Sequence, residues 1–375
     1  MGKKLTRILI LNWRDIKNPL AGGAEILTHE MVKQWVTWGH SVVQISAKFA
    51  KSKDREIIDG ITVIRLGTWW SVHFFAFLYY FKNLRGKIDI IIDEVHGLPF
   101  FAAIYEPRKT VLFACEVAEK IFFHVFPYPV AIIAIILEKI YFKIYKNIPA
   151  LAISPSTKED LISRGFNKKD ITVLPMGLTV PKGLRKFPKE RNPTIIYLSR
   201  INKQKGIEDA IESFRIINDY LPNSSLWVVG SGADEYVARV KRGIKDYGLA
   251  RHVKFFGLVS DTRKFELLSK SHILIFPSIH EGWGLVIAEA GIMGTPSAVY
   301  NASGVRDVVR NGERGIMVKK NRPDLLAIAI IHHFKNDKLY KELVSKIKSF
   351  EEEMGWKKTA RAALQVISKY ENRKN

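Results

Sequence analysis

Short runs of almost wholly apolar residues recur along the chain, separated by segments with the spacing of amphipathic helices. In the first half these runs are RILILNW (7–13), HSVVQIS (40–46), ITVIRL (61–66), IDIIID (88–93), KTVLFA (109–114) and ALAIS (150–154). Near-continuous apolar strands are typical of parallel sheets that helices cover. The segment 24–38, which ends at Gly39, is one of the helices predicted between them.

A second set of such runs follows a polar interruption. Its members are TIIYLS (194–199), SLWVVG (225–230), HVKFFG (252–257), SHILIFPS (271–278) and TPSAVY (295–300). Two sets predict two doubly wound α/β domains of Rossmann type, which also suits a length of 375 residues. The Pro-, Gly- and charge-rich segment 180–193 reads as the linker. We expect domains over 1–182 and 183–355, with a helix over 356–375 packing back on the first.

The composition narrows the classes of protein. With 47% hydrophobic and 26% charged residues, the chain is a folded globular protein. A single cysteine, Cys115, excludes a disulfide framework and a cysteine-based zinc site, and it fits a reducing compartment. The formal net charge of +22 calls for an anionic partner: nucleic acid, an anionic membrane surface or a phosphorylated small molecule.

Membrane signals are of the peripheral kind. The apolar start at 8–11 is too short for a signal-peptide core, and Pro127 and Pro129 interrupt the uncharged segment 121–137, so we expect no transmembrane helix. The segments 69–87 and 138–147 combine aromatic residues with Lys and Arg, which suits a lipid interface. Core-facing helices with snorkelling lysines are the alternative.

The segment FPSIHEGWGLVIAEAGIMGTPSAVY (276–300) carries the strongest chemical signal. A loop joins a strand to a helix there, and free backbone N–H groups at a helix start bind anions. Gly282 and Gly284 let the backbone approach a ligand, so both are candidate donor-binding residues. The carboxylates of Glu281 and Glu289 can accept hydrogen bonds from paired hydroxyls, which indicates a sugar nucleotide. A helix cap with one surface acid is the alternative.

This segment resembles the retaining glycosyltransferases of family four, whose signature is two glutamates separated by seven residues. Here they are Glu281 and Glu289, followed by Gly294 and Pro296. The resemblance implies the GT-B fold, in which two Rossmann-like domains face a cleft. It also implies catalysis without a metal or cofactor, with a nucleotide sugar such as a UDP- or GDP-hexose as substrate.

The same resemblance implies individual roles. Glu289 binds the ribose of the nucleotide, and Glu281 contacts hydroxyls of the donor sugar, which makes it our first catalytic candidate. Backbone groups hold the sugar and phosphate at Trp283, Gly284 and Leu285.

The segment YLSRINKQKG (197–206) follows the first strand of the second domain. Arg200 and Lys205 would lie at the carboxyl edge of the sheet, where two cations can neutralise a diphosphate leaving group. Two solvated loop charges are the alternative. In the family the matching Arg and Lys bind the donor diphosphate, and Ser199 stands here in place of the usual Gly.

Weaker signals add further donor-site candidates. In WVVGSGADE (227–235), Gly230 and Gly232 form either a phosphate loop or a tight turn. In FFGLV (255–259), Leu258 and Val259 resemble the family segment whose backbone contacts the base.

An N-terminal glycine pair is another candidate. In NPLAGGAEILTHEM (18–31), Gly22 and Gly23 open a helix that would bind phosphate or acceptor, unless they form only a structural turn.

The first domain departs from the family at one position. The family places a His after the strand that corresponds to 109–114, where this chain has Cys115 followed by Glu116. One strand earlier, Asp93, Glu94 and His96 lie at a strand's carboxyl edge, and His96 is our second catalytic candidate.

Together these features predict a retaining, metal-independent hexosyltransferase that acts on a glycan or lipid-linked acceptor. We expect it in the cytoplasm, peripheral at the inner face of the membrane. A catalytically weak relative that binds nucleotide sugar or lipid is one alternative. A basic nucleic-acid-binding protein is the other, although the sequence has no helix-turn-helix or zinc-finger motif.

Overall fold

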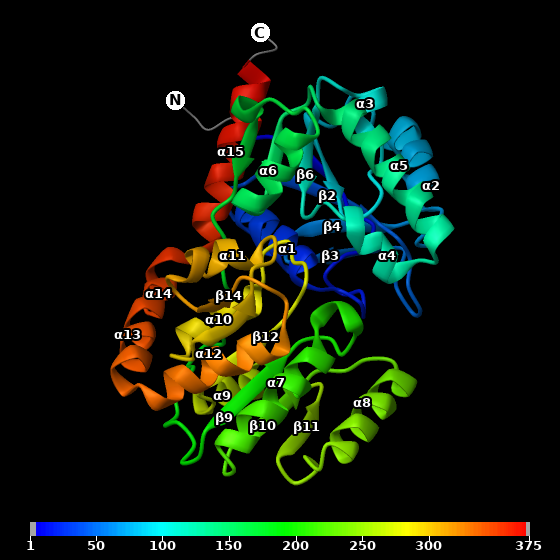
Figure 1. Ribbon diagram of the computed structural model, residues 1–375. Helices are drawn as coiled ribbons and strands as arrows, with labels where there is room; N and C mark the ends of the chain where they lie inside the picture. The colour runs from blue at the N-terminus through cyan, green and yellow to red at the C-terminus, as the bar shows by residue number, and fades with distance from the viewer. Residues whose placement is uncertain (1–4, 373–375) are drawn as a thin grey trace. The chain divides into compact units, whose positions relative to one another are not determined.

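The computed structural model describes residues 5–372, without the side chains of Lys120, His124, Val125 and 370–372. It consists of two compact units (Figure 1). Unit 1 comprises Met1–Gly177 and Met354–Asn375, and unit 2 comprises Leu178–Glu353. The chain therefore leaves unit 1 slightly before the expected boundary at 182/183, and it returns at 354, close to the expected 356. Residues 373–375 of the expected C-terminal helix lie outside the described residues.

Unit 1 is built on a sheet with the strand order β3-β4-β2-β1-β5-β6-β7-β8. Its strands are β1 (Arg7–Leu11), β2 (Ser41–Ser46), β3 (Arg55–Ile58), β4 (Ile61–Arg65), β5 (Ile90–Val95), β6 (Thr110–Ala114), β7 (Ala150–Ala152) and β8 (Ile171–Val173). All pairs are parallel except β3 with β4. The order reverses between β1 and β5, and ligands of such sheets bind beyond the carboxyl ends of the strands at this switch point.

The helices of unit 1 connect these strands. They are α1 (Gly23–Thr37), α2 (Val72–Tyr79), α3 (Ala102–Tyr105), α4 (Phe122–Val125), α5 (Tyr128–Tyr145), α6 (Pro155–Ser163) and α15 (Trp356–Asn372). A π-helical turn, Tyr80–Leu84, extends α2. The helix α15 packs against α1, where Trp35 Nε1 donates a hydrogen bond to the Ala360 carbonyl at 2.9 Å.

The helices α2 and α5 cover the same face of this sheet. Leu9 and Ile91, which are paired across β1 and β5, pack in one core cluster with α2. Leu112, paired with Asp93, packs in a cluster with α5. Ile91 and Asp93 are two residues apart on β5 and so point to the same side.

The helix α5 differs from the sequence prediction. Pro127 and Pro129 do not break it, because the helix begins at Tyr128 and a proline in the first turn gives up no intrahelical hydrogen bond. It therefore joins the apolar end of segment 121–137 to the basic-aromatic segment 138–147. Within residues 5–372, no helix combines the length and the apolar character that crossing a membrane requires.

Unit 2 contains a wholly parallel sheet with the order β11-β10-β9-β12-β13-β14. Its strands are β9 (Thr194–Leu198), β10 (Ser225–Val229), β11 (Val253–Gly257), β12 (Ile273–Phe276), β13 (Ser297–Tyr300) and β14 (Ile316–Val318). Its helices are α7 (Ile207–Tyr220), α8 (Asp234–Asp246), α9 (Asp261–Lys270), α10 (Leu285–Ile292), α11 (Val305–Val308), α12 (Pro323–Lys335), α13 (Asp337–Ile347) and α14 (Ser349–Glu353). The order reverses between β9 and β12, so the switch point lies where Arg200 and Glu281 follow these strands.

Candidate functional site

The loop between β12 and α10 positions the two glutamates of unit 2. Glu281 lies in the loop, and Glu289 lies on α10, which begins at Leu285 directly after Gly284. Both carboxylate side chains are mostly buried, at 13% and 14% exposure. Charges this well shielded from water need partners.

Each of these carboxylates is paired with a lysine. Lys205 Nζ lies 2.5 Å from Glu281 Oε1, so two residues predicted for one site are in direct contact. Lys264 Nζ, from α9, lies 2.7 Å from Glu289 Oε1 and 3.0 Å from Asp261. Burial would lower the pKa of Lys264, but the charge of Glu289 and its hydrogen bond raise it. The sequence carried no signal for Lys264, which reads as an ordinary polar residue of an amphipathic helix.

A neighbouring loop, which contains Gly304, packs closely against the backbone at Glu281. Gly304 has φ of +74°, and a Cβ there would lie 2.3 Å from the Glu281 carbonyl oxygen and 2.6 Å from that of Gly282. The Glu281 N–H donates to the Ser303 carbonyl at 3.3 Å. Only glycine permits this approach, so the position of the 281–284 loop depends on residue 304.

The glycines after β10 have a comparable role beside Arg200. A Cβ on Gly230 would lie 1.9 Å from the Ser199 carbonyl oxygen, and one on Gly232 would lie 2.1 Å from that of Ile201. These glycines allow the loop after β10 to press against the loop that carries Arg200, whose side chain is exposed. The tight-turn interpretation therefore has a direct steric basis.

The remaining donor-site candidates of unit 2 follow the next strand. Leu258 and Val259 come directly after β11, at the same carboxyl edge of the sheet. The side chain of Leu258 is exposed, and that of Val259 is partly buried. The structure thus brings all the predicted unit 2 residues to one edge.

In unit 1 the start of α1 is occupied by the chain itself. The N–H of Gly22 donates to Glu25 Oε2 at 2.7 Å, and Gly23 is the first residue of the helix. Glu25 is buried, and its Oε1 lies 2.8 Å from Arg14 Nε. One backbone donor that was expected to face a ligand thus binds a carboxylate of the same helix.

His96 lies between two carboxylates at the switch point of the unit 1 sheet. Its Nδ1 is 3.6 Å from Glu25 Oε1, and its Nε2 is 3.6 Å from Glu116 Oε1. Arg14 Nη2 lies 3.3 Å from Nδ1. We call Arg14, Glu25, His96 and Glu116 the unit 1 polar cluster. Sequence reasoning singled out His96 but gave no role to Arg14 or Glu25.

The charges of this cluster shift one another. Burial would raise the pKa of Glu25, but the hydrogen bond with His96 and the charge of Arg14 lower it to about 2. Burial would lower the pKa of His96, but Glu25 and Glu116 outweigh it and raise the pKa. The cluster therefore favours an ionised Glu25 beside a protonated imidazole of His96.

Cys115 faces the interior rather than the open side of this cluster. Its thiol is 3% exposed and donates to Glu94 Oε1 at 3.4 Å, and burial raises its pKa. Glu94 is also buried, accepts from Thr28 Oγ1 at 2.7 Å, and has a pKa raised to about 7 by burial. The partly exposed groups here are His96 and Glu116, at 24% each.

Asp93, the third polar residue at the end of β5, also faces inward. Its carboxylate accepts the backbone N–H groups of Phe100 and Ala102, each at 2.9 Å, and the hydroxyl of Tyr145. These contacts fold the loop after β5, so Asp93 shapes the site without facing it.

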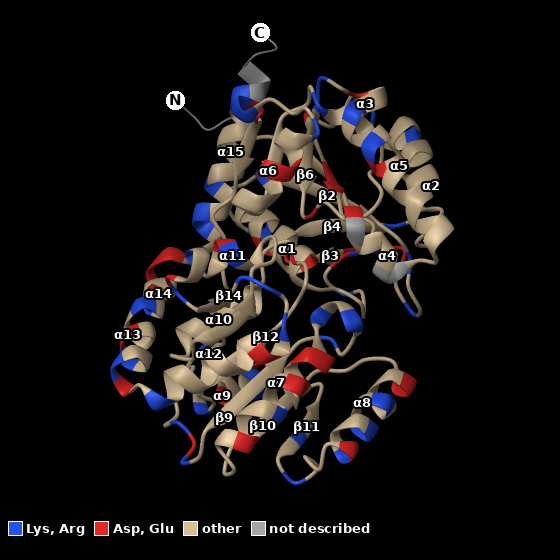
Figure 2. Ribbon diagram, in the orientation of Figure 1, with Lys and Arg blue, Asp and Glu red and all other residues tan. Residues whose placement is uncertain are grey.

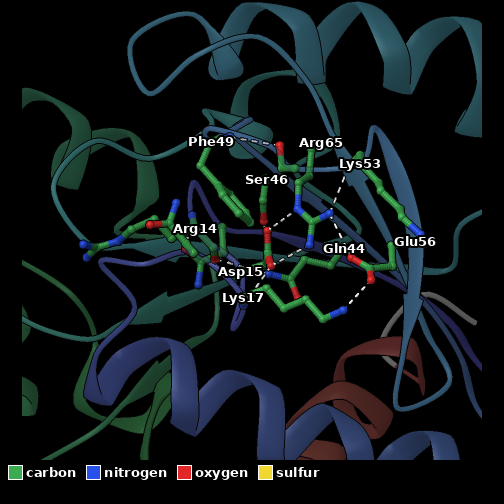
Figure 3. Close-up of polar contacts among 12 residues, drawn as sticks. Arg14, Asp15, Lys17, Gln44, Ser46, Phe49, Lys53, Glu56 and Arg65 are labelled. Carbon is green, nitrogen blue, oxygen red and sulfur yellow. Dashed lines mark hydrogen bonds and ion pairs between the residues drawn. The ribbon is translucent and has the colours of Figure 1, made fainter. Parts of the chain in front are cut away.

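A buried ion pair holds the loop after β1 (Figure 3). Arg65 donates to both oxygens of Asp15, at 2.7 and 2.9 Å, and to the Lys53 carbonyl at 2.9 Å. It also donates to Glu56 at 3.1 Å, and both Arg65 and Asp15 are 1% exposed. Asp15 directly follows Arg14, so this pair positions the unit 1 polar cluster.

The groups gathered at the carboxyl edge of the unit 2 sheet suit an anionic ligand. Among residues 5–372, no three His, Cys, Asp or Glu side chains are arranged to hold a metal ion. In unit 2, Arg200 and Lys205 follow β9, and the N-terminus of α10 follows β12, the neighbouring strand. Fixed cations and a helix N-terminus stabilise phosphate oxygens.

Comparison with known proteins identifies relatives of both units. The model for glycosyl transferases group 1 matches residues 183–350, and that for glycosyltransferase family 4 matches residues 21–180. The capsular polysaccharide biosynthesis glycosyltransferase CapM of Staphylococcus aureus is 32% identical over 214 residues, which is 52% of this chain and 54% of CapM. The chain thus spans about half the length of this relative.

Solved structures share the fold over nearly the whole chain. Sucrose-phosphate synthase from Thermosynechococcus elongatus has a TM-score of 0.77 at 19% identity, over 97% of this chain and 98% of that one. Anabaena Alr3699/HepE, solved in complex with UDP and glucose, has a TM-score of 0.72 at 17% identity, over 97% and 99%. These likenesses confirm the predicted pair of Rossmann-like units of the GT-B class.

Proposed function

Because the chain belongs to the group 1 glycosyltransferases of family four, we propose that it transfers a sugar from a nucleotide-diphosphate donor to an acceptor hydroxyl. One observation carries the proposal. The pairs Lys205–Glu281 and Lys264–Glu289 lie together at the carboxyl edge of the unit 2 sheet, beside the N-terminus of α10. Carboxylates for hydroxyls and cations for phosphates are what a sugar nucleotide requires.

Unit 2 binds the donor in this proposal. Glu289 accepts hydrogen bonds from the ribose diol, and Glu281 accepts them from the donor sugar. Backbone groups of 282–285 contact the sugar and phosphate, and the loops at Gly230, Gly232, Leu258 and Val259 enclose the nucleotide. The burial of both glutamates supports these roles, because a desolvated carboxylate binds hydroxyls more strongly than one in water.

The reaction is a transfer with retention of anomeric configuration. As the sugar–phosphate bond breaks, negative charge grows on the diphosphate, and Arg200, Lys205 and the N-terminus of α10 stabilise it. The acceptor hydroxyl attacks from the same face, and its proton passes to the leaving phosphate. Glu281 is occupied by Lys205, which argues against a covalent sugar–enzyme intermediate at this carboxylate.

Unit 1 binds the acceptor. His96 is our candidate for contact with a substrate hydroxyl, because it is partly exposed and two carboxylates hold it. The thiol of Cys115 points away from that surface toward Glu94. A protein that binds nucleotide sugar with little turnover is the second candidate function, and the buried position of Cys115 favours it, since the family has a His there.

The acceptor we propose is a glycan or a lipid-linked sugar in the synthesis of cell-surface polysaccharide or glycolipid. The similarity to CapM, a capsular polysaccharide enzyme, supports this class. We further propose that the protein works at the inner face of the cytoplasmic membrane, attached from one side. The net charge of +22 supports an anionic surface there.

A panel of UDP- and GDP-sugars tests the proposal, with donor hydrolysis and transfer as readouts. We expect Glu281→Ala and Arg200→Ala to lower turnover by about 100-fold or more. Arg215→Ala, which removes a surface pair with Glu212 on α7, is the matched control and should leave turnover unchanged. NMR of the product gives the anomeric configuration, and activity in EDTA tests metal independence.

Unchanged turnover in both site variants would refute the assignment. Donor binding without turnover would select the second candidate.

A further inference from the structure

Unit 1 exposes a broad apolar surface along α2, α3 and α5. Exposed side chains on it include Phe74, Phe77 and Leu78 of α2 and Ile133, Ile136 and Ile140 of α5. Apolar side chains gathered on this scale at a protein surface mark a binding site for an apolar partner. We call this the α2–α5 surface.

The two helices contribute to one continuous surface. Both cover the same face of the unit 1 sheet, as the core clusters show. The short helix α3 lies between them: it packs against α5, and the ring of Tyr105 contacts Phe77 and Phe81 at centroid distances of 5.4 and 5.7 Å. Ile104 of α3 is 62% exposed and continues the apolar surface across the gap.

The exposed charged side chains of the α2 and α5 segments are basic. Glu106, directly after α3, is partly buried and accepts a hydrogen bond from the Tyr80 hydroxyl. Lys139 and Lys143 of α5 and Lys146, which directly follows the helix, are exposed. The one acidic residue of the helix, Glu138, is 1% exposed and points inward. The segment 69–87 has three exposed basic residues and no acid. The helix α2 itself, Val72–Tyr79, contains no Lys, Arg, Asp or Glu and is drawn in tan in Figure 2.

Aromatic residues lie at the edges of the surface. Trp69 and Trp70, just before α2, are 69% and 70% exposed, and Tyr128 at the start of α5 is 69% exposed. Trp and Tyr prefer the boundary between lipid headgroups and acyl chains, and Lys and Arg prefer the anionic headgroups. If a second copy of the chain covered this surface, two sets of lysines would face and repel each other. The charge pattern therefore favours an anionic lipid surface as the partner.

The inner side of α5 holds the loops of the unit 1 polar cluster. The Glu138 carboxylate accepts the backbone N–H of Ala118 at 2.8 Å and that of Glu119 at 3.1 Å. The Tyr141 hydroxyl donates to the Gly97 carbonyl at 2.8 Å. Gly97 directly follows His96, and Ala118 lies two residues after Glu116, so one helix touches both loops.

We infer that the α2–α5 surface docks on an anionic lipid bilayer and that α5 connects this docking to the His96 and Glu116 loops. The inference rests on the proposed function, because it names the surface and the helix through which an enzyme of membrane-embedded acceptors would attach. Docking restrains α5, and Glu138 passes that restraint to the backbone at 118–119. The acceptor would then meet loops that docking restrains further.

Co-sedimentation of the full chain with vesicles tests the docking. The probes are phosphatidylcholine vesicles with and without phosphatidylglycerol, at low and high salt. We expect binding to the anionic vesicles that falls with salt, and a decrease of about tenfold or more in the variant Ile133→Ser/Ile136→Ser/Ile140→Ser. Ile57→Ser and Ile328→Ser, at apolar positions elsewhere that are at least as exposed, are the controls and should bind as wild type.

Two outcomes would overturn the docking. One is equal sedimentation of wild type and the triple variant. The other is a wild-type dimer, measured by light scattering, that the triple variant loses, because the surface would then be an interface between copies. Donor hydrolysis measured without vesicles distinguishes a failure of the docking inference from a failure of the proposed function. We expect the triple variant to keep it within about twofold, since these isoleucines lie outside the binding site.

Hydrogen exchange of the backbone tests the connection through α5 without any activity readout. We expect anionic vesicles to slow exchange in the segment 116–121 of the wild type. In Glu138→Gln, which retains the α2–α5 surface, binding should persist and the slowing should be lost. Exchange in 116–121 that does not change when the wild type docks would refute the connection.

Discussion

Lys264 Nζ lies 2.7 Å from Glu289 Oε1, so a lysine of α9 neutralises the carboxylate of α10 that we assign to the ribose. This contact engages one carboxylate oxygen and leaves the other to accept hydroxyls. It makes Lys264 a positioning residue for the donor site, although Lys264 lies on α9 and outside the segment 276–300 that carries the two glutamates.

Lys264→Met should raise the KM for the nucleotide sugar by about tenfold while changing kcat less, because it frees Glu289 to rotate. Loss of the partner of a mostly buried carboxylate should also lower the free energy of unfolding of unit 2 by about 1–3 kcal/mol. Steady-state kinetics and urea unfolding measure both. Lys270→Met removes a pair with Glu266 on the same helix and is the control. A KM shift of equal size in the control would exclude a specific role for Lys264.

Gly304→Ala should displace the 281–284 loop, since the new Cβ would overlap the carbonyl oxygens of Glu281 and Gly282. We expect turnover to fall by more than tenfold and stability by about 2 kcal/mol. Gly248→Ala is the control: its φ of +72° is nearly the same, but the space around it is open. Its cost should be limited to backbone strain of about 1 kcal/mol, with normal turnover. Equal turnover in the two variants would contradict the steric argument.

Arg65→Met should destabilise unit 1 by about 3–5 kcal/mol, because it leaves Asp15 charged and buried without its partner. Adding Asp15→Asn should recover part of the loss by removing the unpaired charge. Lys48→Met breaks an exposed pair with Asp54 and should cost under about 1 kcal/mol. Chemical denaturation followed by circular dichroism gives the comparison, and a loss no greater than that of Lys48→Met would show that the pair contributes little.

Glu94 should make unit 1 less stable as the pH rises. Burial raises its pKa from 4.5 to about 7, so the folded state binds this proton more tightly than the unfolded state. The resulting stabilisation is complete below pH 4.5 and is lost as the pH rises through 7. Glu94→Gln, which mimics the protonated form, should have a flatter dependence of the unfolding midpoint between pH 5 and 8. Parallel curves for variant and wild type would show that Glu94 is not the titrating group.

Much of the fold was predictable because its strands are buried on both faces. Runs such as 7–13 and 271–278 are almost wholly apolar, and β1 and β12 lie within them. The strands β8 and β14 have three residues each, too few for a pattern, and β3 is a half-exposed antiparallel edge strand. The prolines near residue 128 were misinterpreted, because their effect depends on where the helix starts.

The site residues that belong to a local sequence motif were predictable, and those that another element contributes without a motif were not. Glu281 and Glu289 form a local motif, whereas Lys264 reaches Glu289 only because α9 and α10 pack together. Arg14 and Glu25 likewise come from separate elements on opposite sides of a turn. The position of Cys115 after β6 was expected, but its inward direction was not. Successive residues of extended chain alternate in direction, so Cys115 faces Glu94 while Glu116 faces His96.

The return of the chain from unit 2 to unit 1 has a consequence for synthesis on the ribosome. Unit 2 is one uninterrupted segment, and its strands and helices have all been made once residue 353 is added. Unit 1 lacks α15 until then. The hydrogen bond from Trp35 to the Ala360 carbonyl and the packing of the Trp356 ring on Gly177 can therefore form only after unit 2 has been synthesised. The part of the chain that is synthesised first is therefore the part whose folding finishes last.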